Sequence, residues 1–268
     1  MLRLDENQVK QKLAGGDSVL GVVCRSLSPV VVELIGLSRF DFVWIDMEHT
    51  TADFTTVEQL CRAADAVGIE TLVRVPDQNV SSIVRVLEAG AAIVNVPQVN
   101  SRLEAEAVVE AAKYHPLGNR GLCSSSRGNL YGFAGKPRDV FSAANRRVMA
   151  MVQIESQQGV ENAPEICSVP DLDIIFIGMA DLSQSFGCPG ELDHPAVVQA
   201  ARQVLAAIRQ SGKVAAMLVE DADRAKSWMV EGVRMLCCGV DIPLIGAKLQ
   251  ETRRAFDLTK ATVTALKR

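Results

Sequence analysis

The chain has 268 residues, of which 48% are hydrophobic and 4% aromatic, and its formal net charge is −4. This length suits a single α/β barrel, and a composition rich in Val, Ala and Leu suits buried parallel strands covered by helices. A negative net charge without a run of Lys or Arg argues against nucleic-acid binding, and no apolar stretch approaches the ~18 residues of a membrane span.

The N-terminal segment and the cysteines favour a cytoplasmic location. The first residues, Met-Leu-Arg-Leu-Asp-Glu-Asn, lack the apolar core of a secretory signal peptide. The cysteines number seven and two of them are adjacent, which suits neither a disulfide framework nor a zinc site. We expect small buried side chains in a reducing compartment. They are Cys24, Cys61, Cys123, Cys167, Cys188, Cys237 and Cys238.

Eight short apolar runs along the chain predict β-strands. The runs are rich in β-branched residues, as buried parallel strands are. The predicted strands cover residues 19–24, 41–45, 71–75, 92–96, 148–153, 173–177, 214–218 and 234–238.

Helical patterns separate these runs. Apolar residues recur at helical spacing over 54–64. Ser101 and Glu104 match a capping box that opens a helix. Pro195 begins a further helical pattern, which Gly212 ends.

Eight strand–helix alternations predict a (β/α)8 TIM barrel. We expect a single domain over residues 1–268, with its core at about 18–250 and a C-terminal helix and tail at 242–268. An open doubly wound sheet is the weaker alternative, because no glycine-rich phosphate-binding turn follows the first strand. Residues 118–135 form a long connection rich in Gly and Ser, which predicts a mobile active-site loop.

Polar residues gather where the second predicted strand ends. Asp46, Glu48 and His49 follow this strand directly, and barrel enzymes carry their chemistry at the carboxyl ends of the strands. A carboxylate three residues before an imidazole can fix its tautomer and raise its basicity, as a general base requires. Acidic residues and His are also common in surface turns, so this segment alone leaves both interpretations open.

Arg74 ends the third predicted strand, inside the apolar sequence Leu-Val-Arg-Val-Pro. A charged side chain in this setting is costly unless a carboxylate or an anionic ligand meets it. The alternatives are a structural ion pair, for which Glu88 is the candidate, and an anionic substrate.

Glu155 and Asp181 follow the fifth and sixth predicted strands, so they should be neighbours on the barrel rim. Two adjacent carboxylates either share a proton or hold a hard divalent cation such as Mg²⁺ or Mn²⁺. The structural alternative is that each acid caps the turn or helix that follows it.

The lysines argue against one mechanism. None of the nine lysines lies at the carboxyl end of a predicted strand, where a Schiff-base enzyme needs its amine. The sequence also lacks a nucleophile elbow, a P-loop and a metal-binding histidine pair. Electrophilic catalysis by a metal ion is the chemistry that remains.

Several motifs resemble those of the HpcH/HpaI class II 2-oxo-acid aldolases. Weaker matches at 85–90, 119–121, 193–195 and 239–241 extend the resemblance over roughly residues 20–250. The stronger motifs are Ile45-Asp46-Met47-Glu48-His49, Leu72-Val73-Arg74-Val75-Pro76, Val152-Gln153-Ile154-Glu155 and Ile177-Gly178-Met179-Ala180-Asp181-Leu182-Ser183.

The resemblance implies a metal-dependent lyase that forms or uses the enolate of pyruvate or a related 2-oxo acid. Glu155 and Asp181 would ligate the divalent metal. His49, oriented by Asp46, would be the general base, and Arg74 would stabilise the enolate oxygen. Negative charge develops on a ketone oxygen in this reaction, and a metal with a guanidinium suits that charge.

The resemblance also implies substrate contacts and an assembly. Gln153 and Gly178 would support the pyruvate site, and backbone amides near Ala180 and Asp181 would receive the pyruvate carboxylate. Family members commonly form hexamers built from dimers that exchange a C-terminal helix, here at 242–258. We therefore expect a homo-oligomer, from dimer to hexamer.

Three departures from the family suggest a different second substrate. Met179 stands where most members carry Pro, and Val23 stands where many carry a Trp beside pyruvate. The loop at 120–132 lacks the Ala- and Arg-rich pattern of sugar-acid aldolases. The alternative function is a citrate synthase-like condensation of oxaloacetate with acetyl-CoA, as in siderophore biosynthesis, with Arg127 binding an extra carboxylate or the thioester.

A third hypothesis, a non-catalytic sensor or assembly subunit, predicts damage to the acid–base set, and the sequence shows none. The expected partners are therefore a small 2-oxo acid together with an aldehyde or an acyl thioester.

Overall fold

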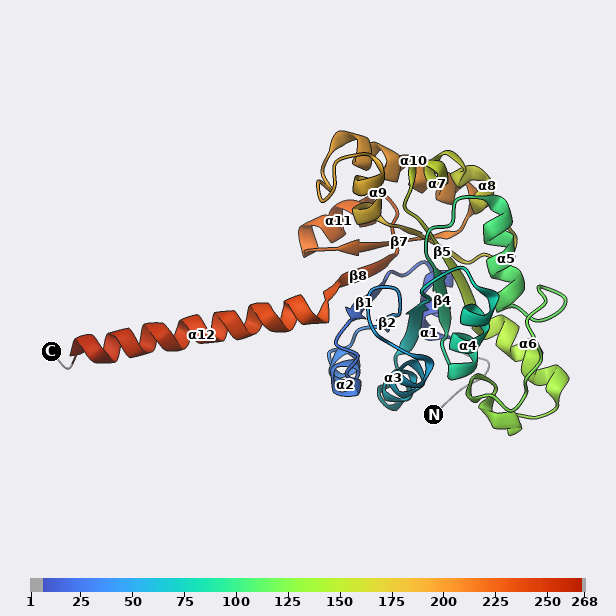
Figure 1. Ribbon diagram of the computed structural model, residues 1–268, viewed down its shortest axis with the longest axis horizontal. Coiled ribbons are helices and arrows are strands. Elements are labelled where there is room, and N and C mark those ends of the chain that lie inside the picture. The colour runs from blue at the N-terminus through green and yellow to red at the C-terminus, as the bar shows by residue number, and fades with distance from the viewer. Residues whose placement is uncertain (1–6, 267–268) are drawn as a thin grey trace.

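The computed structural model describes residues 7–266, apart from the side chains at 261–265, and its fold is a closed barrel of eight parallel strands. Each strand pairs with its neighbours in chain order, and β8 pairs with β1 (Figure 1). The predicted TIM barrel is confirmed, and every predicted strand agrees with an observed one to within two residues at each end. The strands are β1 Val19–Cys24, β2 Phe42–Asp46, β3 Glu70–Arg74, β4 Ile93–Val96, β5 Met149–Ile154, β6 Ile174–Ile177, β7 Val214–Val219 and β8 Met235–Val240.

Helices follow the strands and surround the barrel (Figure 1). The predicted capping box of Ser101 and Glu104 precedes α5, and Gly212 ends α10 with a left-handed φ of 71°. None of the described helices is long and apolar enough to cross a lipid bilayer. The helices are α1 Gln8–Ala14, α2 Pro29–Leu37, α3 Phe54–Val67, α4 Val80–Ala89, α5 Arg102–Ala112, the 3₁₀ helix η1 Arg127–Gly132, α6 Pro137–Arg147, α7 Gln157–Glu161, α8 Ala163–Cys167, α9 Met179–Ser185, α10 Pro195–Ser211, α11 Ala222–Val230 and α12 Asp241–Leu266.

The strands are buried on both faces. Phe42, Trp44 and Leu72 belong to the cluster that fills the barrel interior. Val43 and Ile45, which alternate with them along β2, belong to the outer cluster between strands and helices. This alternation follows from the two-residue period of a strand, and it explains why the strand sequences are apolar throughout.

The amino end of the barrel is closed by α1. Val9 of this helix is fully buried in the interior cluster. Asn7 donates from Nδ2 to the backbone oxygen of Arg147 at 3.0 Å, and Arg234 donates from Nη1 to the oxygen of Leu13 at 2.7 Å. The barrel can therefore be open only at its other end, where the carboxyl termini of the strands meet.

The connection at 118–135 lies at the closed, amino end of the barrel. Arg127, at the start of η1, is buried, donates to the oxygen of Ala89 at 2.9 Å and pairs with Asp65. Ala89 ends α4, which runs from the carboxyl end of the barrel to its amino end. The prediction of an active-site loop is therefore wrong, because both ends of this connection return to the base of the barrel.

The last helix does not cover the barrel. α12 has 26 residues, about 39 Å, and it packs on β1 and β8 before it projects away from the domain (Figure 1). Apolar side chains such as Leu249 and Phe256 are exposed along it. An apolar groove that includes Leu20 and Met229 remains open beside β1, β7, β8 and α11.

Candidate active site

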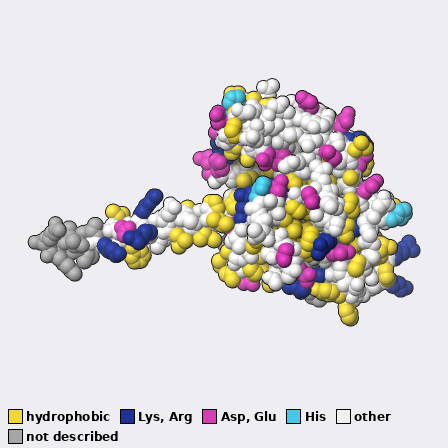
Figure 2. Space-filling view, viewed as in Figure 1, with side chains coloured by type: hydrophobic (Ala, Val, Ile, Leu, Met, Phe, Trp, Pro, Cys, Tyr) yellow, Lys and Arg dark blue, Asp and Glu magenta, His cyan; other side chains and the backbone are white. Residues whose placement is uncertain are grey.

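One cavity of about 340 Å³ lies at the carboxyl ends of the strands. Its walls are largely apolar and include Val23, Trp44 and Phe176. On the face of the molecule shown in Figure 2, acidic side chains, a histidine and a cationic side chain meet near the middle of the barrel. The charged and polar side chains that line the cavity are Arg25, His49, Arg74, Gln153, Glu155, Asp181 and Glu220.

Asp46 and Arg74 form a bidentate ion pair behind this cavity. Arg74 donates from Nε to Asp46 Oδ1 at 2.9 Å and from Nη2 to Oδ2 at 2.7 Å. Arg25 adds a third bond, from its Nε to Asp46 Oδ2 at 2.9 Å. Burial alone would raise the pKa of the fully buried Asp46, but the bonds and charges of the two arginines outweigh it and lower that pKa. Asp46 is therefore favoured in its ionised form, and it holds two guanidinium groups in place.

The turn after β2 is also built on Asp46. Its Oδ1 accepts from the backbone N–H of Glu48 at 3.1 Å and of His49 at 3.4 Å, a local pattern that aspartate favours in turns. The carboxylate of Asp46 makes no contact with the His49 imidazole. The prediction that Asp46 orients this imidazole is therefore wrong, because Arg74 and Arg25 occupy its oxygens.

Glu48 takes the place next to the imidazole. Its Oε2 lies 2.8 Å from Arg74 Nη1 and 3.8 Å from His49 Nε2, while His49 keeps half of its side chain exposed. Burial raises the pKa of Glu48, and the charges of Arg74 and His49 partly oppose this. The sequence placed Glu48 at the strand end but predicted no role for it.

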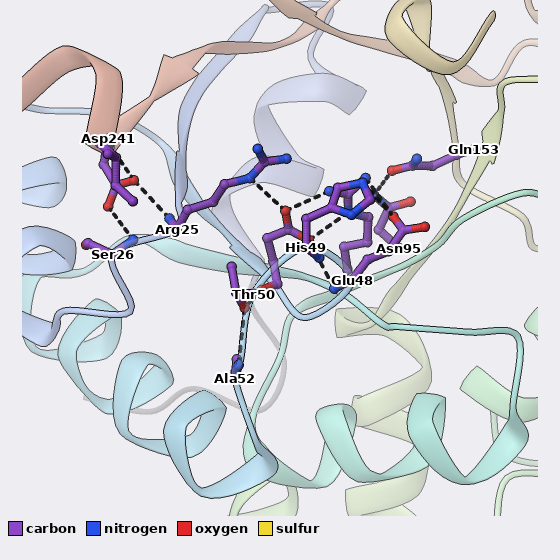
Figure 3. A network of polar contacts seen from close by, with 12 residues as sticks. Arg25, Ser26, Glu48, His49, Thr50, Ala52, Asn95, Gln153 and Asp241 are labelled. Carbon is purple, nitrogen blue, oxygen red and sulfur yellow. Dashed lines mark hydrogen bonds and ion pairs between the residues drawn. The ribbon is translucent and has the colours of Figure 1, made fainter. Parts of the chain in front are cut away.

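A chain of amides leads to Glu155 across β4 and β5, and Figure 3 shows its first two members, Asn95 and Gln153. Asn95 donates from Nδ2 to Gln153 Oε1 at 2.7 Å, and Gln153 donates from Nε2 to Glu155 Oε2 at 2.6 Å. The backbone N–H of Gln98 donates to Glu155 Oε1 at 2.8 Å. Both oxygens of Glu155 therefore accept hydrogen bonds that fix its orientation, and Gln153 donates one of them.

The pair Glu155 and Asp181 has the properties of a cation site. Burial, together with the negative charge of Asp181, raises the pKa of Glu155 to about 7. An added Cβ at Gly178 would lie 2.5 Å from Glu155 Oε2, so glycine keeps this carboxylate accessible. Neither acid is the N-cap of the helix beside it, since Ser156 caps α7 and Gly178 precedes α9. A divalent cation suits two acids that are costly to ionise together.

The donor set has only two carboxylates at its centre. Among residues 7–266, no group of three or more His, Cys, Asp or Glu side chains is arranged to hold a metal. A hard cation held by two carboxylates keeps several positions for water and substrate oxygens, as Mg²⁺ sites commonly do. The residues present therefore suit a catalytic cation better than a closed structural site.

Most of the predicted site residues meet at this cavity. The exceptions are Asp46, which lies directly behind Arg74, and Arg127, which is buried at the opposite end of the barrel. The predicted substrate contact of Arg127 is therefore wrong. Glu88 is also wrong as the predicted partner of Arg74, because Arg74 pairs with Asp46 and Glu48. The predicted residues that line the cavity are His49, Arg74, Gln153, Glu155, Gly178, Ala180 and Asp181.

The lining residues Arg25, Trp44 and Glu220 have polar groups but were not among the predicted site residues. Arg25 and Glu220 directly follow β1 and β7, so the strand-end position that identified Asp46 could also have identified them. Trp44 could not be singled out, because its strand is apolar throughout. The backbone of Trp44 pairs in register with Val23. The Trp44 ring lies 5.2 Å from the Arg74 guanidinium, and its Nε1 is buried without a partner among the described residues. An indole is thus present here, on β2 rather than β1.

No lysine among the described residues lines the cavity. Burial lowers the pKa of Lys113, but this lysine bonds to the oxygen of Val148, next to the amino end of β5. Lys113 therefore lies outside the cavity, and its lowered pKa does not make it a candidate for contact with substrate.

Comparisons with known proteins give matches over most of the chain. The family model described as HpcH/HpaI aldolase/citrate lyase matches residues 20–246. A 5-keto-4-deoxy-D-glucarate aldolase of Klebsiella pneumoniae is 31% identical over 93% of this chain and 96% of its own length. The crystal structure of citrate synthase SbnG has a TM-score of 0.86 at 30% identity, covering 96% of this chain and 99% of that one. An HpcH/HpaI aldolase/citrate lyase family protein from Burkholderia cenocepacia J2315 has a TM-score of 0.87 at 30% identity, covering 95% and 100%.

Proposed function

Because the chain belongs to the HpcH/HpaI aldolase/citrate lyase family and is an enzyme of the aldolase and lyase type, we propose that it is a divalent-metal-dependent carbon–carbon lyase. It would act through the enolate of pyruvate or a related 2-oxo acid. The observation that carries the proposal is a single cavity that brings Glu155 and Asp181 together with His49 and Arg74. The similarity to 5-keto-4-deoxy-D-glucarate aldolases supports it.

Glu155 and Asp181 would hold the cation, and Mg²⁺ or Mn²⁺ prefers such carboxylate oxygens. When bound, the cation supplies Lewis-acid polarisation of a ketone oxygen and stabilises the negative charge that develops there. Gln153 and the backbone of Gln98 fix the orientation of Glu155. Gly178 and Ala180 line the cavity at the start of α9, where backbone amides are available for the carboxylate of the 2-oxo acid.

Arg74 is held so that part of its guanidinium remains free for substrate. A guanidinium has five N–H groups, of which two bond to Asp46 and one meets Glu48. The remaining N–H groups can donate to the substrate oxygen as negative charge develops on it. Asp46 and Glu48 thus provide the rigidity, and Arg74 provides the contact.

His49 would move the proton. In the cleavage direction it removes the proton of the C4 hydroxyl, C4 becomes the carbonyl carbon of the released aldehyde, and the electron pair of the broken C3–C4 bond forms the enolate. A proton then adds to C3 of the enolate and gives pyruvate. In the reverse direction His49 returns the proton to the new alkoxide. While His49 carries the proton its ring is an imidazolium, and Glu48 Oε2, 3.8 Å from Nε2, would stabilise that positive charge.

Two assays test this proposal. The metal-loaded protein should exchange the methyl protons of pyruvate for deuterium and should cleave 4-hydroxy-2-oxo acids to pyruvate. His49→Gln should lose both activities, whereas His115→Gln, at an exposed position, should retain them. Absence of both activities from the parent with Mg²⁺ and with Mn²⁺ would refute the proposal.

The second candidate keeps the site and changes the partner. The similarity to the citrate synthase SbnG favours condensation of oxaloacetate with acetyl-CoA. Arg127 no longer supports it, because this residue lies at the other end of the barrel. Free thiol released from acetyl-CoA only when oxaloacetate is present would establish this candidate, and no release with either metal would remove it.

We also infer a homo-oligomer, in which α12 of one copy lies in the apolar groove of another. The exposed apolar residues of α12 and the open groove beside β1, β7, β8 and α11 support it. Leu249→Glu should shift the parent to a smaller species in light scattering, whereas Lys248→Glu should not. A monomeric parent would refute the inference.

A cytoplasmic location is part of the proposal. All seven cysteines are free thiols in the structure, and five of them are buried. A chain that uses no disulfide suits a reducing compartment.

A further inference from the structure

We propose that Arg25 binds a second carboxylate of the substrate pair, in addition to the carboxylate of the reacting 2-oxo acid. This inference rests on the proposed function and names the residue that would select acidic substrates. The second carboxylate belongs either to the acceptor, as in an aldehyde acid, or to a 2-oxo dicarboxylic acid such as oxaloacetate.

The backbone of Arg25 is held firmly at the cavity edge. Arg25 directly follows β1, and its N–H donates to Asp241 Oδ1 at 2.9 Å. The N–H of Ser26 donates to the other oxygen of Asp241 at 3.0 Å (Figure 3). Asp241 is 3% exposed, so this clamp is shielded from water. A guanidinium on such a support can bind a ligand in one position.

The side chain of Arg25 keeps most of its donors free. Only its Nε is bonded, to Asp46 Oδ2, and no described residue accepts from its two Nη atoms. The side chain is 37% exposed and lines the cavity beside His49 and Arg74. Figure 3 shows the side chain of Arg25 extending away from Asp241 and toward His49. The Nη edge of a guanidinium has the geometry to bind a carboxylate through two bonds.

Arg25 is the weaker of the two arginine partners of Asp46. Arg74 already binds both oxygens of Asp46, whereas Arg25 makes a single bond to it. Glu220 lines the cavity in addition to Glu155 and Asp181, and its Oε2 lies 3.6 Å from Arg224 Nε. The apolar walls near Arg25, including Val23 and Val240, lower the local dielectric and strengthen its attraction for an anion.

The test compares substrates that carry the second carboxylate, called the acidic members, with substrates of similar size that lack it, called the neutral members although 2-oxobutyrate keeps the carboxylate of its 2-oxo acid group. The aldehyde pair is glyoxylate against glycolaldehyde with pyruvate, and the 2-oxo acid pair is oxaloacetate against 2-oxobutyrate. Arg25→Met should lower kcat/KM about 10- to 100-fold for the acidic member of one pair, the loss expected for a charged hydrogen bond. Its neutral partner and deuterium exchange into pyruvate should stay within about 2-fold. The affected pair identifies which molecule carries the second carboxylate.

Control variants distinguish two roles of Arg25, namely binding of the second carboxylate and structural support of Asp46. Arg25→Lys should recover part of the preference, and Arg202→Met, which breaks an exposed ion pair with Glu231 outside the cavity, should leave it unchanged. Equal losses for acidic and neutral members would overturn the proposal, because they would show that Arg25 acts only through Asp46 and Arg74.

A calorimetric titration keeps this inference independent of turnover. Oxaloacetate and 2-oxobutyrate are titrated into the magnesium-loaded parent and Arg25→Met, and the two aldehydes are titrated with oxalate present in place of pyruvate. The parent should bind one acidic member more tightly, and Arg25→Met should lose that difference. A parent without exchange into pyruvate refutes the proposed function, whereas a preference unchanged in Arg25→Met, or absent from the parent, refutes the role of Arg25.

Discussion

Arg74 and Arg127 are buried arginines at opposite ends of the barrel, and each is paired with an aspartate. Their side chains are 7% and 3% exposed. Arg74, at the open end, keeps N–H groups that face a cavity. Arg127, at the closed end, bonds to Asp65 and to the oxygen of Ala89, and it lines no part of that cavity. The same kind of ion pair therefore leaves N–H groups facing a cavity at one end of the barrel and is enclosed by packed chain at the other.

Metal removal should separate the two ends most strongly. A chelator should reduce pyruvate exchange to background, because Glu155 and Asp181 would lose the cation that stabilises the developing charge. Added Mg²⁺ or Mn²⁺ should restore it, while the circular dichroism spectrum stays that of the folded barrel throughout. Activity that survives exhaustive chelation would contradict the metal site.

Arg74→Lys should have the next largest effect. Lysine is a compact cation that cannot make the bidentate bond to Asp46 and also reach Glu48 and substrate. We expect kcat/KM to fall about 100- to 1,000-fold, as for loss of an oxyanion donor. Arg202→Lys, which alters an exposed bidentate pair with Glu231, is the matched control and should change kcat/KM little. A parent-like Arg74→Lys would show that its ion pair is only structural.

Arg127→Met should show the opposite pattern. It removes the bonds to Asp65 and Ala89 at the closed end, so we expect the free energy of unfolding to fall by about 2 kcal/mol in urea titrations. The kcat/KM of the folded variant should equal that of the parent. Selective loss of activity with unchanged stability would return Arg127 to the substrate site.

The pH dependence of stability offers the smallest and most specific test. In the chelated protein the pKa of Glu155 is raised to about 7, above the ~4.3 expected in the unfolded chain. The folded state therefore binds this proton more tightly, and the resulting stability is present below the unfolded pKa and lost as pH rises through 7. Glu155→Gln lacks that loss. Its Tm relative to the parent should rise by a few °C between pH 5 and pH 8.

A matched variant isolates the effect of burial on Glu155. Glu161→Gln removes an exposed carboxyl group from α7 and should keep the same Tm difference from the parent at both pH values. Excess Mg²⁺ should reverse the advantage of Glu155→Gln at pH 8, since the cation stabilises the ionised parent. An advantage of Glu155→Gln that does not change with pH would contradict the raised pKa.

The sequence by itself determined the barrel and the position of the candidate site. Apolar runs and helical periodicity predicted all eight strands, because a strand buried on both faces must be apolar along its whole length. The end of a strand can be located in the sequence, and the fold brings all strand ends to one rim of the barrel. This identified four residues that line the cavity, namely His49, Arg74, Glu155 and Asp181.

Only the tertiary structure decided which side chains meet. Asp46 bonds to Arg74 and Arg25 instead of the imidazole of His49, three residues away, because the arginines on the neighbouring strands offer charge and better geometry. The burial of Arg127 and the projection of α12 were equally beyond local patterns. Local sequence sets the direction of the backbone, whereas a pair of side chains depends on strand register and on the end of the barrel to which a loop returns.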